Sequence, residues 1–192
     1  MDSLIGVVGK DFVMLASDTG MSDNLAMLST GEPGDVDHFS EYIQRNIALY
    51  KMLHQALSPQ AAANFTRRQI YQSLRSGEGL KLVNMLIAGY DQHRKRGQLF
   101  SLDYLGGMNE APYAFEGFCQ YFGLAIGDRL WHPNMEEPEV HGLIIKVIHE
   151  ISNRMAFNKN IYPPKTLIER PLNFVINTAP ALALSKDENI SS

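Results

Sequence analysis

The feature that most constrains the fold is the segregation of short β-rich segments from pairs of amphipathic helices along the chain. Short apolar segments bounded by turn residues are typical of strands, and apolar residues at every third or fourth position are typical of helices. In chain order the pattern predicts strands at 4–8, 12–17 and 25–29, helices at 37–57 and 58–75, strands at 82–90 and 99–104, helices at 117–130 and 136–153, and strands at 172–178 and 181–185. We therefore expect an α+β fold in which two stacked antiparallel sheets are each covered by helices on the outer face.

Residues 37–57 show the clearest helical periodicity. Apolar residues recur there at a spacing that predicts one core-facing stripe. The stripe consists of Phe39, Ile43, Ile47, Tyr50, Leu53 and Leu57. Tyr42, Leu49 and Met52 fall outside it, so we expect them to be surplus apolar side chains on the surface of the isolated chain.

Local signals also predict where elements begin and which strand is most deeply buried. Asp35 or Asp37 is a candidate N-cap for the first helix, and Ser58 followed by Pro59 is typical of the start of the second. Residues 82–90 are nearly continuously apolar, which predicts a strand buried on both faces.

Composition excludes several classes of function. A chain of 192 residues is expected to form one domain, and its net charge of −4 argues against non-specific binding to nucleic acid. No apolar run reaches the length of a membrane span, and the N-terminus lacks the pattern of a secretory signal. Because Cys119 is the only cysteine, an internal disulfide is excluded and a reducing compartment is expected.

Several blocks of the sequence resemble proteasome beta subunits, which are N-terminal-nucleophile hydrolases. The blocks are the opening hairpin at 1–18, the turn at 29–35, the segments at 39–50 and 57–61, and the strand at 84–91 with its return at 102–106. The segments at 39–50 and 57–61 are similar to the beta-4 type in particular. The resemblance covers roughly residues 1–155. It implies a four-layer α-β-β-α sandwich in a single domain, 1–192, with residues 156–192 as a divergent C-terminal segment.

The resemblance also indicates where the family's catalytic positions fall. Active members use a processed N-terminal threonine, whose hydroxyl is the nucleophile and whose amine is the base. That position falls on Asp2, a carboxylate that cannot do this chemistry. Asp18 matches the first carboxylate of the family, and Gly31 matches the glycine whose backbone N–H stabilises the oxyanion.

Other parts of the family site have no counterpart in this chain. The strands that carry the activating lysine are missing between Ser22 and Leu25, which either a deletion or a loop omitted from the sequence would explain. The family's serine falls on Phe118, and residues 156–159 offer no second carboxylate. We therefore expect no catalytic residue, and Asp2, Asp18 and Gly31 are interpreted as remnant positions.

The remaining candidate residues have structural explanations. Cys119 lies among aromatic residues and is interpreted as a buried structural thiol. The six histidines lack the spacing of a metal-binding pair, so we expect neither a metal nor a cofactor. Residues 93–96 are basic, but their place at a hairpin tip favours solvated charge over a nuclear-import or nucleic-acid patch.

The resemblance as a whole implies a non-catalytic structural beta subunit of the proteasome core particle, which contributes to the chamber wall and ring assembly for intracellular protein degradation. The implied partners are other beta and alpha subunits in a stacked hetero-oligomeric ring, with no nucleic acid and no membrane. The implied location is the cytoplasm and nucleus.

Two alternatives stay open at this point. One is an active N-terminal-nucleophile protease subunit of a homomeric ring, for which Ser3 is the only hydroxyl residue near Met1. The other is a free α+β binding module. The native mass distinguishes a large hetero-oligomer, a homomeric ring and a monomer.

Overall fold

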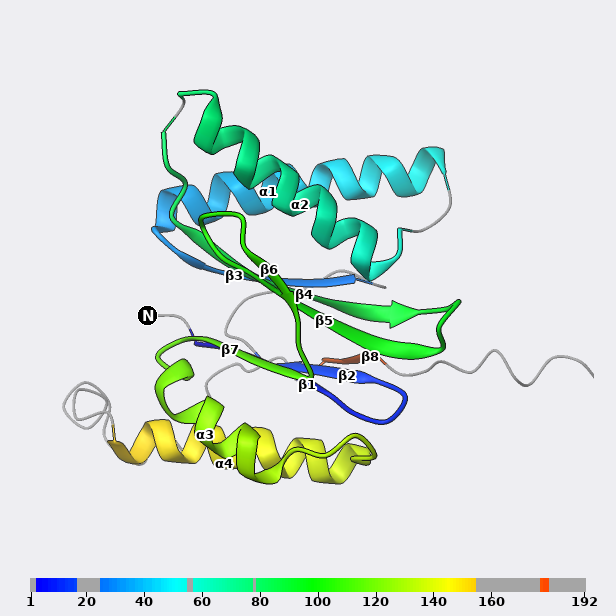
Figure 1. The fold of residues 1–192 in the computed structure, drawn as a ribbon, viewed down its shortest axis with the longest axis vertical. Helices are drawn as coiled ribbons and strands as arrows, with labels where there is room; N and C mark the ends of the chain where they lie inside the picture. Colours follow the sequence, from blue (N-terminus) through cyan, green and yellow to red (C-terminus); the bar gives the residue numbers. More distant parts are fainter. Residues whose placement is uncertain (1–2, 17–24, 55–56, 78, 155–176, 180–192) are drawn as a thin grey trace, which may run out of the picture.

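A computed structural model describes residues 3–16, 25–54, 57–77, 79–154 and 177–179 (Figure 1). The elements in chain order are β1 (Ser3–Val8), β2 (Val13–Ala16), β3 (Leu25–Gly31), α1 (Pro33–Leu53), α2 (Pro59–Arg75), β4 (Val83–Asp91), β5 (Arg96–Leu102), β6 (Met108–Glu110), β7 (Tyr113–Gly117), α3 (Gln120–Leu130), α4 (Glu137–Arg154) and β8 (Asn177–Ala179). Among the helices of the described ranges, none combines the length and the apolarity needed to cross a membrane.

The strands form two four-stranded antiparallel sheets. The first has the order β7-β1-β2-β8 and the second the order β3-β4-β5-β6. Figure 1 shows the sheets stacked face to face, with α1 and α2 over the outer face of the second sheet and α3 and α4 over that of the first. The predicted α-β-β-α sandwich of two stacked antiparallel sheets is therefore confirmed.

Each interface between layers has its own apolar core. One core lies between the second sheet and α1 and α2, another between the first sheet and α3 and α4, and a third between the sheets. Along β4, Met85 and Ile87 face the helices, while Leu86 and Ala88 face the other sheet. Both faces of this strand are buried, which explains its nearly continuous apolar sequence.

The two sheets approach each other closely where Gly97 of β5 meets the β1–β2 hairpin. A Cβ atom built on Gly97 would lie 2.5 Å from the carbonyl carbon and oxygen of Phe12. No side chain fits in that space, so at this position the sheets touch backbone to backbone.

The start of α1 differs from the prediction. The helix begins at Pro33, with Glu32 as an N-cap that makes no side-chain hydrogen bond. The carboxylate of Asp35 instead accepts a hydrogen bond from the backbone N–H of Leu82, at 3.0 Å. The predicted caps, Asp35 and Asp37, were therefore wrong, because Asp35 joins the helix to the segment before β4.

The predicted core stripe at 37–57 holds for its first part and for Leu57, which lies beyond the end of α1 and packs against the same core. Phe39 and Ile43 are buried, and Ile47 packs against the same core. Tyr50 is 44% exposed and Leu53 is 68% exposed, so placing them in the core was wrong. The physical reason is that the periodicity continues through the last turns of α1, whereas the core under this helix ends at Ile47.

Other boundaries follow the sequence more closely. The predicted cap of the second helix is confirmed, because the Ser58 hydroxyl accepts a hydrogen bond from the Ala61 backbone N–H at 3.2 Å. The pattern missed β6 and β7, which lie between the predicted return strand and the third helix. The end of the predicted strand at 172–178 overlaps β8, while residues 172–176 and 181–185 lie outside the described residues.

Candidate functional site

Gly31 is the one remnant position that lies within the described residues, because Asp2 and Asp18 fall outside them. It ends β3, an edge strand of the second sheet, opposite Val83 of β4. Its φ of 149° lies in the region that favours glycine, and a Cβ atom would lie 1.9 Å from the carbonyl oxygen of Leu82. Local backbone geometry therefore requires glycine here, whatever its chemical role.

The hydrogen-bond pattern of β3 and β4 fixes the direction of the Gly31 N–H. Glu32 donates its backbone N–H to the carbonyl of Leu82 at 2.9 Å, so these two residues form a hydrogen-bonded pair. In an antiparallel ladder such pairs alternate with non-bonded ones. Gly31 and Val83 consequently form a non-bonded pair, and the Gly31 N–H points away from β4, off the edge of the sheet. An oxyanion donor needs such an outward N–H.

Gly31 lines a pocket of about 660 Å³, and residues from the end of β7 in the first sheet line the same pocket. Phe118, which falls at the position of the family's serine, lines the same pocket, so the structure brings two of the matched positions together. The described lining is completed by Thr30, Pro33, Leu82, Asn84, Tyr104, Glu116, Gly117, Gln120 and Tyr121.

The polar group that joins the two sheets beside this pocket is the carboxylate of Glu116, on β7. It accepts hydrogen bonds from the side-chain amide of Asn84, at 3.2 Å, and from the hydroxyl of Ser101, at 3.0 Å. The pKa of Glu116 lies above its ordinary value, mainly because the carboxylate is partly buried. The two hydrogen bonds lower the pKa, and the negative charge of Asp103 raises it further. Sequence reasoning missed this residue, because its partners come from distant strands.

The chemistry available in the pocket is limited. Its described lining offers one threonine hydroxyl and one carboxylate, but neither a lysine nor a histidine. Nucleophilic catalysis by a hydroxyl needs a base or a group that lowers its pKa. Within the described lining, the outward N–H of Gly31 is thus accompanied by a hydroxyl and a carboxylate, but not by the lysine that the family site uses.

Cys119 lies where β7 joins α3, and it is buried. Its Sγ lies 2.9 Å from the carbonyl oxygen of Leu4 and 2.8 Å from that of Glu116. Burial raises the pKa of this thiol to about 12, so it stays protonated at neutral pH. The interpretation of Cys119 as a structural thiol is confirmed.

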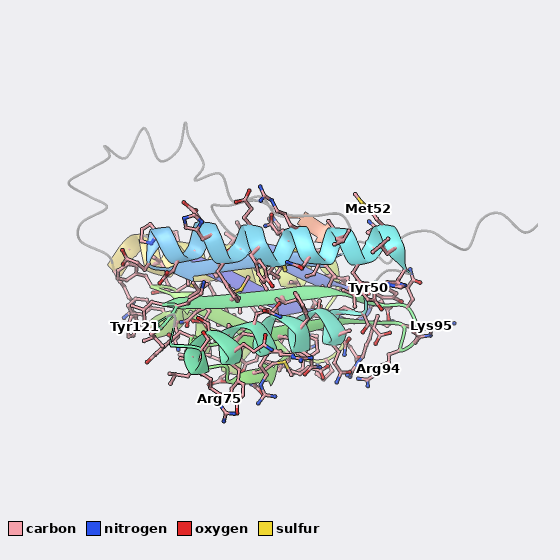
Figure 2. The ribbon with its side chains drawn as sticks, turned by 90° about the horizontal axis from the view of Figure 1, so that it is seen from above. Tyr50, Met52, Arg75, Arg94, Lys95 and Tyr121 are labelled. Carbon is pink, nitrogen blue, oxygen red and sulfur yellow. The ribbon has the colours of Figure 1, made fainter. Side chains whose placement is uncertain are left out.

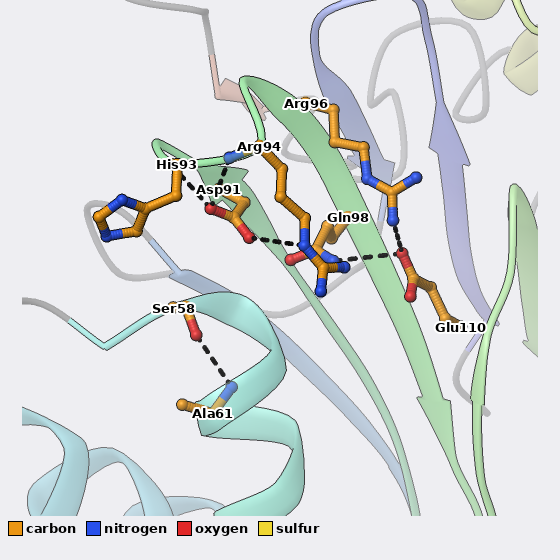
Figure 3. Close-up of polar contacts among 8 residues, drawn as sticks. All are labelled: Ser58, Ala61, Asp91, His93, Arg94, Arg96, Gln98 and Glu110. Atoms are coloured by element: carbon orange, nitrogen blue, oxygen red, sulfur yellow. Dashed lines mark hydrogen bonds and ion pairs between the residues drawn. The ribbon is translucent and has the colours of Figure 1, made fainter.

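The basic segment at 93–96 lies in and beside the turn between β4 and β5, as predicted (Figure 3). The Asp91 carboxylate accepts hydrogen bonds from the backbone N–H groups of His93, at 2.9 Å, and Arg94, at 3.1 Å. The pKa of Asp91 lies below its ordinary value. The hydrogen bond from the Arg94 backbone lowers it most, the bond from His93 and the Arg94 charge lower it further, and burial opposes these effects. Beside the turn, Glu110 accepts from Arg96 at 2.8 Å and from the Gln98 amide at 3.2 Å.

Metal binding has no support among the residues that the structure describes. No group of three or more histidine, cysteine, aspartate or glutamate side chains comes close enough there to hold an ion. The carboxylates at the β4–β5 hairpin are already paired with Arg94 and Arg96.

Comparison with known proteins assigns the family. A family model described as "Proteasome subunit" matches residues 2–162. A probable proteasome subunit beta type-4 of Schizosaccharomyces pombe is 36% identical over 176 residues, which cover 82% of this chain and 90% of the relative. The beta type-4 subunit of Saccharomyces cerevisiae is 32% identical over 176 residues, which cover 82% of this chain and 88% of that relative. The beta type-2 subunit of Caenorhabditis elegans is 34% identical over 178 residues, which cover 82% of this chain and 89% of that relative.

The match to the family model extends over both helix pairs and over strands β1 to β7 of the two sheets, so sequence and architecture agree. This chain belongs to the proteasome subunit family, and within it to the beta subunits, with beta type-4 members among its similar relatives.

Proposed function

We propose that this chain is a non-catalytic beta subunit of the proteasome core particle, whose role is to build the chamber wall and the ring. The observation that carries this proposal is the similarity to beta type-4 subunits across 82% of the chain. The pocket beside Gly31 supports the non-catalytic part, because its described lining contains no lysine or histidine to activate a hydroxyl. The aspartate at position 2 supports it further.

The proposed partners are other beta subunits beside this chain and alpha subunits above it, in a stacked hetero-oligomeric ring. Support comes from the names of the relatives, which are themselves proteasome subunits, and from apolar side chains exposed on the outer helices. We further propose that the complex acts in the cytoplasm and nucleus, which suits a chain with a single, unpaired cysteine.

The competing function is an active protease subunit of a homomeric ring. The outward N–H of Gly31 is the feature that favours it, since this is the geometry of an oxyanion donor. An active subunit would also need a processed N-terminal threonine or serine, and Ser3 is the nearest candidate to Met1.

Purification of the complex that contains this chain separates the two functions. Native mass spectrometry should give a particle with several different beta and alpha chains. A covalent threonine-directed inhibitor should label other chains and leave every peptide of this one unmodified. A homomeric ring, or an inhibitor adduct on a mature chain that begins at Ser3, would overturn the proposal.

A further inference from the structure

The carboxylate of Glu116 carries a negative charge that no cation among the described residues balances. It forms no ion pair with any of them, and its two hydrogen bonds come from neutral donors, the Asn84 amide and the Ser101 hydroxyl. Partial burial and the nearby charge of Asp103 both raise its pKa. Because an ionised carboxylate is unfavourable when it is partly removed from water without a counterion, a cation placed beside Glu116 would be stabilised.

Aromatic side chains line the same pocket as this carboxylate. Besides Gly31 and Glu116, the described lining contains Tyr104, Phe118 and Tyr121. Tyr104 belongs to the β5–β6 loop, Phe118 to the turn between β7 and α3, and Tyr121 to the first turn of α3. The face of an aromatic ring attracts a cation that lies within about 6 Å of the ring centre, and cages of such rings hold organic ammonium ions. The pocket therefore combines rings and a carboxylate, both of which favour a cation.

The charges around the pocket are negative on balance. Its described lining contains no lysine, arginine or histidine. Beside that lining, the carboxylates of Asp35 and Asp103 accept hydrogen bonds from backbone N–H groups, and the guanidinium of Arg67 donates to a carbonyl of the β5–β6 loop. The basic β4–β5 hairpin is remote, since Figure 2 shows Tyr121 at the end of the molecule opposite Lys95. No described positive charge thus occupies the place that the pocket offers to a cation.

We propose that the pocket beside Gly31 binds an alkylammonium group, with Glu116 as its counterion and the rings of Phe118 and Tyr121 against its alkyl part. The positive charge supplies the counterion that Glu116 lacks, and the rings remove the alkyl part from water. Neither contact needs a catalytic group, so the inference goes beyond the proposed function and does not depend on it. The lysine side chain of a polypeptide and a free amine share this chemistry.

The test uses the full chain in the complex with which it is purified. The probe is a butylammonium ion that carries a photoreactive diazirine, and mass spectrometry of the digested chain locates its adducts. n-Butylammonium is the charged competitor, and 1-pentanol is its neutral counterpart of similar size. A blocked tripeptide with a central lysine is compared with n-butylammonium, which distinguishes a polypeptide side chain from a free amine.

Variants separate the role of the charge from that of the rings. Glu116→Gln removes the charge with little change in shape, and Phe118→Leu and Tyr121→Leu each remove one ring. Glu110→Gln is the control for the carboxylate, because Glu110 also accepts two side-chain hydrogen bonds. Tyr42→Leu is the control for an exposed tyrosine. Incorporation of each variant into the complex checks folding, and Tyr121, which is 76% exposed, can be replaced without disturbing the core.

We expect saturable adducts on peptides that contain Tyr104, Phe118 or Tyr121, and displacement of the probe by n-butylammonium but not by 1-pentanol. Glu116→Gln should weaken binding by about tenfold or more. Each ring variant should weaken it by about three- to tenfold, and both controls should stay within about twofold of wild type. Affinity should increase as pH rises through the raised pKa of Glu116, because only the ionised carboxylate attracts the cation, and Glu116→Gln should abolish this dependence.

The inference is wrong if these peptides carry no saturable adduct, if 1-pentanol competes as well as n-butylammonium, or if Glu116→Gln and both ring variants bind the probe like wild type. Such results leave the proposed function intact, because that function is judged by the composition of the complex. Stronger competition by the tripeptide than by n-butylammonium identifies a polypeptide as the source of the cation, and the reverse order identifies a small amine; either order supports the site.

Discussion

The carboxylate of Glu116 accepts a hydrogen bond from the side-chain amide of Asn84, 3.2 Å away on the facing sheet. Ser101 donates to the other carboxylate oxygen at 3.0 Å. An otherwise apolar layer between the sheets thus ends in a polar cluster beside the pocket that Gly31 lines. Because Glu116 is partly removed from water, this cluster links the packing of the two sheets to pH.

Glu116→Gln should reduce the pH dependence of folding stability. The pKa of Glu116 is raised in the folded chain, so the folded state holds the proton more tightly than the unfolded state. Its contribution to stability is therefore greatest at low pH and declines as pH rises from the ordinary value of 4.5 through the raised pKa. Urea unfolding measures the free energy of unfolding at each pH. Between pH 4.5 and neutrality, this free energy should fall less for the glutamine variant than for wild type. Equal losses in the two proteins would contradict this, and exposed Glu137→Gln serves as the control.

Substitutions in the packed part of α1 should lower the free energy of unfolding far more than substitutions at its exposed end. Ile43→Ala removes a fully buried side chain and should cost about 2–5 kcal/mol. Leu53→Ala, on the exposed last turn, should cost less than about 0.5 kcal/mol. Equilibrium unfolding in urea measures both values. A comparable cost for the two variants would mean that Leu53 packs on something outside the described residues.

Gly31→Ala should destabilise the fold by about 2 kcal/mol or more, because the new Cβ would meet the Leu82 carbonyl and the positive φ is unfavourable for alanine. Gly34→Ala is a close control, since a Cβ there meets nothing within 4 Å. Gly34 lies in the first turn of α1, where alanine should stabilise by up to about 1 kcal/mol. Thermal unfolding of both variants beside wild type would show opposite shifts.

Cys119 should be inert in the folded protein. With a pKa of about 12, only about one thiol in ten thousand is ionised at pH 8, and the side chain is buried. A thiol reagent such as DTNB should therefore react only as fast as the chain unfolds, and urea should abolish the protection. Rapid stoichiometric labelling of native protein would show that the thiol is open to solvent.

Sequence reasoning succeeded where one local signal dictates the structure. The apolar run of β4 predicted a strand buried on both faces, and Ser58 with Pro59 predicted the start of α2. It failed where the outcome depends on distant neighbours. Asp35 is compatible with a helix cap by local rules, yet Leu82, 47 residues away, supplies its partner.

The same reason limits what the sequence predicts of the candidate site. The resemblance located Gly31, but Glu116 gave no signal, because its partners Asn84 and Ser101 are 32 and 15 residues away in the chain. The strand β7 that carries Glu116 was itself missed, since its short sequence breaks the apolar pattern with this carboxylate. Tyr50 and Leu53 were misplaced for a related reason, since periodicity gives the direction of a side chain and not the extent of the layer below it.

Gly97 and Glu116 lie toward opposite ends of the interface between the sheets: the first allows backbone contact with Phe12, and the second reaches Ser101 near the far end of β5. The two sheets are therefore held together by different means at the two ends of their interface: by close backbone packing at Gly97 and by a hydrogen-bonded carboxylate at Glu116. A substitution at the first end changes the spacing of the sheets at any pH, whereas the contacts at the second end depend on the protonation of Glu116.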